Sequence, residues 1–249
     1  MSIDDEDDML GMRAAGRVVR ETLEAMRLAV APGVSTAQLD AIAGRVMHEH
    51  GGRSAPRLVY DFPGETCISV NDEIVHGIPS KRRTLRSGDL VKLDVTTELN
   101  GYMADAAITV GVGRISPLAE RLLACTQHAL ECALREVRPG RRAFEVGGVV
   151  EREANRQGFS VVRALQGHGI GRTIHEEPMM PNWADPAARG LLREGLVITV
   201  EPILAAGSGD SFEGDDGWTI LTADGTLSAH FEHTLVVTKN GPILLTAAA

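Results

Sequence analysis

The chain has 249 residues, 43% of them hydrophobic, and carries a formal net charge of −9 at pH 7. This length and apolar fraction predict one large domain or two small ones with a sizeable core. The acidic balance argues against nucleic acid or an anionic membrane as the main partner, and no stretch approaches the ~20 apolar residues of a membrane span. The three cysteines, Cys67, Cys125 and Cys132, lack paired spacing, which is typical of reduced thiols in a cytoplasmic protein.

An acidic run, DDEDD, occupies positions 4–8. We expect it to form a solvated tail, and its charge argues against a secretory signal there. Beyond it, apolar periodicity predicts helices and β-branched composition predicts strands. In chain order we expect helices at 9–30 and 35–50, strands at 89–99 and 101–110, helices at 117–137 and 143–157, and strands at 195–204 and 230–238.

This order of elements occurs twice along the chain. In each half a Pro-Gly pair ends one helical segment and a glycine ends the next. Four pairs of residues, each 107 positions apart, mark the repeat: Gly33 and Gly140, Gly51 and Gly158, Gly88 and Gly195, Asp94 and Glu201. The constant offset predicts two pseudo-symmetric halves, roughly 9–112 and 116–245, with a site between them that takes residues from both.

Four carboxylates lie inside the expected strands, where acidic residues are depleted: Asp94, Asp105, Glu201 and Glu232. A carboxylate on a buried strand is costly unless it is paired or binds a metal ion. For any one of them, an edge strand or a salt bridge is a sufficient explanation. Together with His168, which lies between glycines in the stretch GHGIG, they favour a metal site.

Carboxylate and imidazole ligands suit Mn²⁺, Fe²⁺, Co²⁺ or Zn²⁺ rather than a metal that needs thiolates. The number of negative charges fits two cations better than one. Two metal ions ~3.5–4 Å apart can share a bridging water and lower its pKa toward neutrality. The predicted reaction class is therefore hydrolysis. A phosphate-binding loop is disfavoured, because GHGIG lacks the full GxGxxG spacing after a strand.

Five motifs carry a resemblance to a known family: CISVNDEIVHGIP, LDVTTELNGYMADAAIT, GHGIGRTIHEEP, TVEPIL and DGWTILTADGTLSAHFEHTLVVT. Together they resemble type I methionine aminopeptidases over nearly the whole chain. The resemblance implies an α+β pita-bread fold, in which two pseudo-symmetric halves of antiparallel strands are backed by helices, and a single catalytic domain over 1–249. It also implies that the protein removes the N-terminal methionine from nascent polypeptides with a small second residue.

The resemblance assigns metal-binding roles to five matching positions. Asp94 would chelate one of two divalent metal ions, and Asp105 and Glu232 would bridge both. His168 and Glu201 would complete the second ion, and Glu201 would also handle the proton of the bridging water. The metal could be Co, Mn, Fe or Zn, because the same ligands accept all of them.

Substrate-binding roles follow from the same resemblance. His76 and His175 would bind substrate and stabilise the tetrahedral intermediate. The methionine side chain would lie in an apolar pocket that contains Phe62, Cys67 and Trp218, since a thioether packs well against aromatic rings and sulfur.

Two histidines flank Glu232 in the last expected strand. His230 has the same strand parity as Glu232, so we expect it to support the metal ligands from behind. His233 has the opposite parity and should point away from the site. The glycines around His168 would let the backbone pass close to the metal ions.

Two alternatives remain open. An X-Pro aminopeptidase or dipeptidase of the same fold usually carries an extra N-terminal domain, for which this chain is too short. A catalytically inactive binding protein on this scaffold would generally have lost metal ligands, and all five are present. The expected partner is the N-terminal methionine of nascent polypeptides, with the ribosome exit region as a second candidate, and we expect a monomer.

Overall fold

The computed structural model describes residues 1–247, which contain five helices. Four of these confirm the sequence prediction to within a few residues: α1 (Glu6–Ala29), α2 (Thr36–Glu49), α4 (Pro117–Glu136) and α5 (Ala143–Gln157). The fifth, α3 (Ala55–Tyr60), has only six residues, too few for apolar periodicity to predict it. Hydroxyl caps mark three of the helix starts, because the side chains of Ser35, Ser54 and Ser116 accept hydrogen bonds from the backbone N–H groups of Gln38, Arg57 and Ala119.

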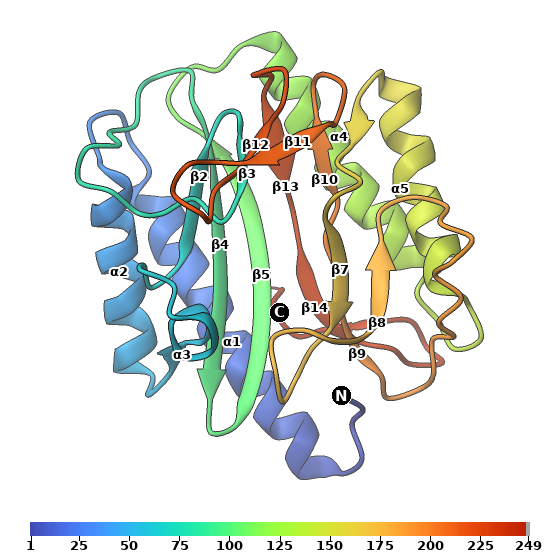
Figure 1. The fold of residues 1–249 in the computed structure, drawn as a ribbon. Coiled ribbons are helices and arrows are strands. Elements are labelled where there is room, and N and C mark those ends of the chain that lie inside the picture. The colour runs from blue at the N-terminus through green and yellow to red at the C-terminus, as the bar shows by residue number, and fades with distance from the viewer. Residues whose placement is uncertain (248–249) are drawn as a thin grey trace.

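Antiparallel strands make up the rest of the ordered framework (Figure 1). Their bounds are β1 (Arg53–Ser54), β2 (Cys67–Val70), β3 (Glu73–Val75), β4 (Leu90–Leu99), β5 (Tyr102–Gly111), β6 (Ser160–Val161), β7 (Gln166–Gly169), β8 (Glu176–Pro181), β9 (Val197–Val200), β10 (Ile203–Ala205), β11 (Ser211–Glu213), β12 (Ile220–Thr222), β13 (Ser228–His230), β14 (His233–Val236) and β15 (Ile243–Leu244). A four-stranded sheet of β1, β2, β4 and β5 belongs to the first half. A five-stranded sheet in the order β15-β14-β9-β7-β8 belongs to the second.

The acidic run at 4–8 was predicted to be a solvated tail, but it forms the start of α1, with Asp4 to Asp7 exposed and Asp8 buried. Asp5 caps α1 by accepting a hydrogen bond from the backbone N–H of Asp8 at 2.9 Å. Asp8 is buried and accepts hydrogen bonds from the Tyr102 hydroxyl at 3.0 Å and the Arg172 guanidinium at 2.7 Å. Negative charge is favourable near a helix N-terminus, so an acidic run also suits the start of a helix.

The two strands expected at 195–204 and 230–238 are each interrupted. The first divides into β9 and β10 around Glu201 and Pro202, and the second divides into β13 and β14 around Phe231 and Glu232. Pro202 has no N–H to donate to a neighbouring strand, so it cannot continue the ladder. At both breaks the chain passes between the five-stranded sheet and the small sheet β13-β10-β6. Glu201 and Glu232 therefore lie at the two points where the chain leaves one of these sheets and enters the other.

The two halves repeat each other's contacts at the 107-residue offset. The backbone N–H of Gly33 donates to the carbonyl of Leu85 at 2.8 Å, and that of Gly140 donates to the carbonyl of Leu192 at 2.9 Å. Gly33 has a φ of 92° and Gly140 a φ of 90°, a left-handed conformation that favours glycine. These equivalent contacts confirm the pseudo-symmetric α+β fold.

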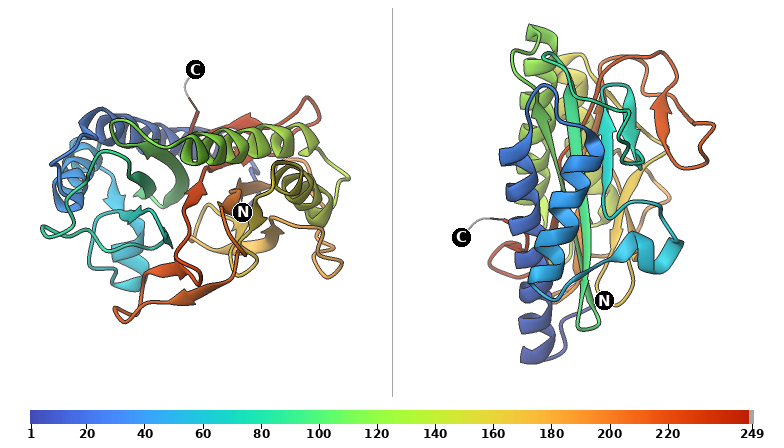
Figure 2. Two further views of the ribbon diagram at one scale, coloured as in Figure 1. Left: turned by 90° about the horizontal axis from the view of Figure 1, so that it is seen from above. Right: turned by 90° about the vertical axis from the view of Figure 1, so that its left-hand side faces the viewer.

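All four long helices cover the same side of the strands (Figure 2). Met12 and Val19 of α1 pack in one hydrophobic cluster with Val91 of β4, and Leu122 of α4 packs in a second cluster with Ile198 of β9. Each half thus has its own core between helices and strands. The face of the strands turned away from the helices is left for the site.

Candidate metal centre and pocket

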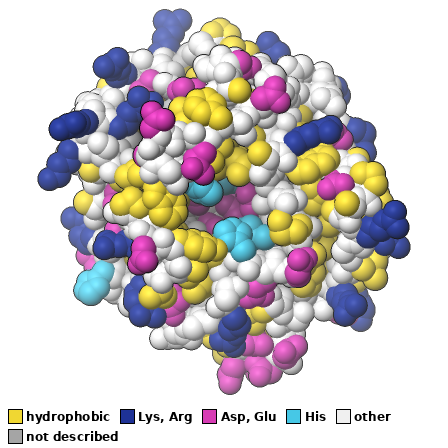
Figure 3. Space-filling view, viewed as in Figure 1, with side chains coloured by type: hydrophobic (Ala, Val, Ile, Leu, Met, Phe, Trp, Pro, Cys, Tyr) yellow, Lys and Arg dark blue, Asp and Glu magenta, His cyan; other side chains and the backbone are white. Residues whose placement is uncertain are grey.

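A small pocket opens on the strand face opposite the helices. In Figure 3, histidine and acidic side chains are visible in a hollow that hydrophobic side chains surround. The pocket has a volume of about 100 Å³ and is lined by Pro56, Tyr60, Phe62, Cys67, His76, Asp94, Thr96, Asp105, Ile174, His175 and Trp218. This is well below the ~300–1,000 Å³ of typical ligand pockets, so it suits a single amino-acid side chain.

The first half contributes Asp94 and Asp105 from neighbouring strands. In the β4–β5 register, Asp94 pairs with Ala107 and Asp105 pairs with Thr96. Alternate residues of a strand share a face, so the two carboxylates lie diagonally across the same side of this hairpin. β4 also pairs with β2 through Asp94 and Cys67, which brings the pocket wall beside the carboxylates.

The second half contributes His168, Glu201 and Glu232. His168 Nε2 is 3.6 Å from Glu201 Oε1. The backbone N–H of Glu232 donates to the carbonyl of Ala107 in β5 at 2.9 Å, which joins the two halves at the site. One ligand atom each from Asp105, His168 and Glu232 lie within 4.8 Å of one another. The structure therefore places three of the five predicted ligands within 4.8 Å of one another, with Glu201 beside His168 and Asp94 diagonally across the hairpin from Asp105.

Burial and mutual repulsion set the charge state of this cluster. Burial, reinforced by the charge of Asp105, raises the pKa of Asp94, Glu201 and Glu232 well above their usual range. Burial raises the pKa of Asp105 to about 7, although hydrogen bonds such as that from Thr96 oppose the shift. Carboxylates this close cannot all ionise near neutral pH without a compensating positive charge.

The donor atoms fit divalent cations. Within residues 1–247, Asp105 Oδ1 and Glu232 Oε1 are buried without a hydrogen-bond partner, and burying such an oxygen unpaired is unfavourable. Burial and the neighbouring His175 lower the pKa of His168 to about 4, so its ring is neutral and offers a lone pair. Carboxylate oxygens with a neutral imidazole are ligands for Mn²⁺, Fe²⁺, Co²⁺ and Zn²⁺.

Gly167 and Gly169, on either side of His168, were expected to let the backbone pass close to the metal ions, but the structure gives a different reason for them. A Cβ on Gly167 would lie 2.8 Å from the carbonyl oxygen of Thr199, and one on Gly169 would lie 2.3 Å from that of Glu177. These glycines therefore let β7 fit tightly between β9 and β8, and no close approach to metal ions is needed to explain them. Their effect is to hold His168 on a central strand.

Both predicted substrate histidines lie at the pocket. His76 follows β3 with a φ of 58°, a conformation that costs about 1–3 kcal/mol for a residue with a Cβ. His175 precedes β8, with its ring centroid 4.3 Å from that of His168. Both histidines are exposed at the mouth of the pocket, but the protein around them displaces part of their water and lowers the pKa of each ring, and the proximity of His175 lowers that of His76 further. Both rings are therefore neutral at neutral pH, with one N–H to donate.

The predicted apolar residues form one wall of the pocket. Phe62 and Trp218 make an edge-to-face contact with ring centroids 5.1 Å apart and an interplanar angle of 83°. Cys67 is buried, and its burial raises the pKa of the thiol well above the usual value, so it stays protonated. The wall thus offers two aromatic faces and a neutral sulfur to a side chain in the pocket.

Two further residues hold the site together and were not found from the sequence. The Thr199 hydroxyl donates to Glu201 Oε1 at 2.9 Å and accepts from the backbone N–H of His168 at 3.0 Å. The Tyr60 hydroxyl lies 2.6 Å from Nδ1 of His175. Thr199 has the strand parity of Glu201, which is a signal that could have identified it. No pattern marks Tyr60, because α3 is too short.

Buried carboxylates and a neutral imidazole below a side-chain-sized pocket, on this fold, define the class of metal-dependent hydrolases. Comparisons with known proteins support this class. A model of metallopeptidase family M24 matches residues 11–239. The chain belongs to metallopeptidase family M24.

The relatives that match along the whole chain are methionine aminopeptidases. The chain is 41% identical over 247 residues to a protein named methionine aminopeptidase 2 of Bacillus subtilis, covering 99% of both chains. It is 39% identical to a methionine aminopeptidase of Aquifex aeolicus, covering 94% of both. The crystal structure of a methionine aminopeptidase from Thermotoga maritima superposes with a TM-score of 0.96 at 33% identity, with all of both chains covered. A full-length match to enzymes of this kind makes the protein a hydrolase.

More distant structures share the fold alone. A prolidase from Pyrococcus furiosus gives a TM-score of 0.80 at 21% identity, and only 65% of that chain is covered. Within residues 1–247, no helix is both long and apolar enough to cross a membrane.

Proposed function

We propose that the protein is a dinuclear-metal aminopeptidase that removes the N-terminal methionine from nascent polypeptides with a small second residue. The observation that carries the proposal is the cluster of buried carboxylates directly beneath a pocket sized for one side chain. Similarity to methionine aminopeptidases along the whole chain supports it. Nascent chains carry their initiator methionine in the cytoplasm, which is therefore the proposed place of action, and the enzyme would act there as a monomer near the ribosome exit region.

The proposed ligands divide between two cations. Asp94 would hold one cation, Asp105 and Glu232 would be shared by both, and His168 and Glu201 would hold the second. The central position of Asp105 supports its bridging role, because its charge raises the pKa of Asp94, Glu201 and Glu232 alike. All five proposed ligands belong to a single proposed catalytic domain over 1–249, with halves at roughly 9–112 and 116–245. Residues 248–249 of this domain lie outside the described part of the structure.

When bound, the two cations would polarise the scissile carbonyl and lower the pKa of the attacking water. Glu201 accepts the proton of that water, and the Thr199 hydroxyl holds its carboxylate in place at 2.9 Å. His175 donates a hydrogen bond to the scissile oxygen as negative charge develops there, while His76 binds the substrate backbone. The left-handed backbone at His76 aims its ring into the pocket at an energetic cost, which supports a functional position.

The methionine side chain would lie in the pocket and pack against the wall formed by Phe62, Cys67 and Trp218. A thioether gains about 0.3–1.5 kcal/mol from contact with an aromatic ring, and Phe62 and Trp218 present two rings at nearly a right angle. The preference for a small second residue would follow if the site between the two halves is narrow. Neither an X-Pro peptidase nor an inactive binding protein is favoured, because full-length similarity is to methionine aminopeptidases and all five proposed ligands are present.

A peptide panel tests the proposal. Purified protein with Co²⁺ or Mn²⁺ is given Met-Ala-Ser, Met-Lys-Ser and Ala-Pro peptides. We expect rapid release of methionine from Met-Ala-Ser, slow release from Met-Lys-Ser and no cleavage of Ala-Pro. Comparable kcat/KM for the two methionyl peptides would remove the small-residue preference, and cleavage of Ala-Pro alone would replace the function with an X-Pro peptidase.

A further inference from the structure

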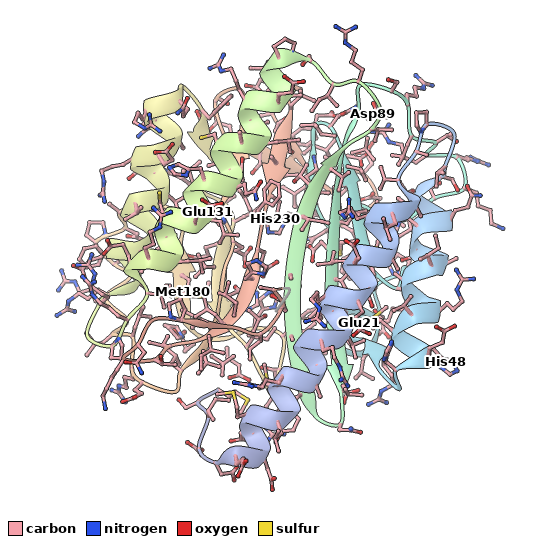
Figure 4. All side chains as sticks on the ribbon, turned by 180° about the vertical axis from the view of Figure 1, so that it is seen from behind. Glu21, His48, Asp89, Glu131, Met180 and His230 are labelled. Carbon is pink, nitrogen blue, oxygen red and sulfur yellow. The ribbon has the colours of Figure 1, made fainter. Side chains whose placement is uncertain are left out.

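His230 is a buried histidine at the centre of the site that the five proposed ligands do not include. It ends β13, two residues before Glu232, and is 2% exposed. Its backbone is fixed on both sides by Thr109 of β5, because the His230 N–H donates to the Thr109 hydroxyl at 2.8 Å and that hydroxyl donates to the His230 carbonyl at 2.7 Å. Figure 4 labels His230 in the interior of the molecule, beside β5.

The ring of His230 has unused bonding capacity. Neither Nδ1 nor Nε2 has a hydrogen-bond partner among residues 1–247. Nε2 lies 3.6 Å from Glu232 Oε2 and 3.9 Å from Glu201 Oε2. These distances exceed those of a hydrogen bond, so the ring is not acting as a donor that holds either carboxylate.

The distances instead match those of two atoms that share a cation. His168 Nε2 and Glu201 Oε1, two of the proposed ligands, are 3.6 Å apart, the same separation as between His230 Nε2 and Glu232 Oε2. Ligand bonds of about 2.0–2.2 Å place neighbouring donor atoms roughly 3–4 Å apart.

We propose that Nε2 of His230 is a sixth protein ligand, which adds a second imidazole to the cation that Glu201 binds. This inference rests on the metal centre of the proposed function. It contrasts with the sequence-based expectation that His230 supports the ligands from behind. Imidazole favours Zn²⁺, Fe²⁺ and Co²⁺, whereas carboxylate-rich sites suit Mn²⁺ and Mg²⁺. A second imidazole therefore shifts the selectivity of the centre toward Zn²⁺, Fe²⁺ and Co²⁺.

Metal competition titrations on three variants test this role. His230→Gln keeps a polar side chain of similar length but removes the imidazole. His168→Gln removes a ligand of the proposed centre. His233→Gln is the matched control, because His233 lies three residues away and its Nδ1 is hydrogen-bonded to the Thr246 hydroxyl at 2.8 Å. Dissociation constants for Zn²⁺, Co²⁺ and Mn²⁺ are measured against a chelator of known affinity, and folding is checked by circular dichroism.

We expect His230→Gln to weaken Zn²⁺ and Co²⁺ binding by more than the roughly 10–100-fold that follows when a group supporting a ligand is removed, with a smaller effect on Mn²⁺. His233→Gln should match the wild type. If His230→Gln also matches the wild type for Zn²⁺ and Co²⁺, His230 is not a ligand. Failure of the wild type itself to bind metal would overturn the proposed function. Normal binding by the wild type with a loss only in His168→Gln would overturn the role of His230 alone.

A second measurement covers the case in which His230→Gln does not fold. Wild-type protein labelled with ¹⁵N-histidine is titrated with Zn²⁺ and followed by NMR. Two imidazoles should show the shift of a directly bound nitrogen. A single shifted imidazole would overturn the proposal.

Discussion

Replacing Thr199 with valine should weaken both the fold and the metal centre, because one hydroxyl serves two ligand residues. Thr199 is fully buried, donates to Glu201 Oε1 at 2.9 Å and accepts from the His168 backbone N–H at 3.0 Å. Valine has nearly the same shape but makes neither bond. The bond to Glu201 contributes about 0.5–1.5 kcal/mol while that carboxyl is protonated, and the buried N–H left unpaired costs about 1–3 kcal/mol. We therefore expect Thr199→Val to lower the free energy of unfolding by about 2–4 kcal/mol.

The matched control is Thr22→Val. Thr22 is also fully buried, but its hydroxyl has no hydrogen-bond partner among residues 1–247. Removing an unpaired buried hydroxyl should be neutral or mildly stabilising. Urea unfolding of both variants, in chelator, measures the difference directly. A metal titration should in addition show affinity about 10–100-fold weaker in Thr199→Val, since Glu201 and His168 lose their shared support. If the two variants unfold and bind metal alike, the coupling of the ligands through Thr199 is wrong.

Three other predictions concern catalysis and charge. Tyr60→Phe removes the hydroxyl 2.6 Å from Nδ1 of His175. The value of kcat should then fall about 3–10-fold with little change in KM. An unchanged kcat in steady-state assays would show that Tyr60 does not position His175. Glu201→Gln should reduce kcat about 10²–10⁴-fold, whereas a raised KM with normal kcat would exclude proton transfer by this residue. The pKa of Asp105 is raised to about 7 and that of Asp94 is also raised. In the metal-free protein, these two groups therefore add to the free energy of unfolding below pH ~4, and this contribution is lost as pH rises through about 7. Metal ions offset that loss, so the gap between metal-loaded and metal-free melting temperatures should widen from pH 5.5 to pH 8, and a constant gap would contradict the cause given for these shifts.

Most of the fold could be predicted from the sequence because its signals are local and periodic. The long helices have continuous apolar faces, and the 107-residue offset follows from glycines such as Gly33 and Gly140, whose left-handed backbone both halves require. The breaks at Glu201 and Glu232 were missed because the β-branched composition continues across them. Only Pro202 signals the first break, and the exchange of sheets there is decided by pairing with distant strands.

The candidate site likewise contains some residues that the sequence predicts and others that it does not. Carboxylates within apolar strands are visible in a sequence because each violates a local preference, as Asp94 and Asp105 do. The contact between Tyr60 and His175 joins residues 115 positions apart, and no local pattern encodes it. The same holds for His230, because its parity suggested a place near Glu232 but only the geometry reveals two unpartnered ring nitrogens.

Metal content measured together with methionine release shows whether two bound metal ions are responsible for the activity. The wild type, Asp105→Ala and the surface control Asp210→Ala are loaded with Co²⁺ or Mn²⁺, freed of excess metal and analysed by mass spectrometry, and each is assayed on Met-Ala-Ser. We predict two bound metal ions and rapid methionine release for the wild type and Asp210→Ala. Asp105→Ala should retain at most one ion and release no methionine, because the carboxylate between the other acids is gone. Full metal content with normal turnover in Asp105→Ala would contradict the dinuclear centre.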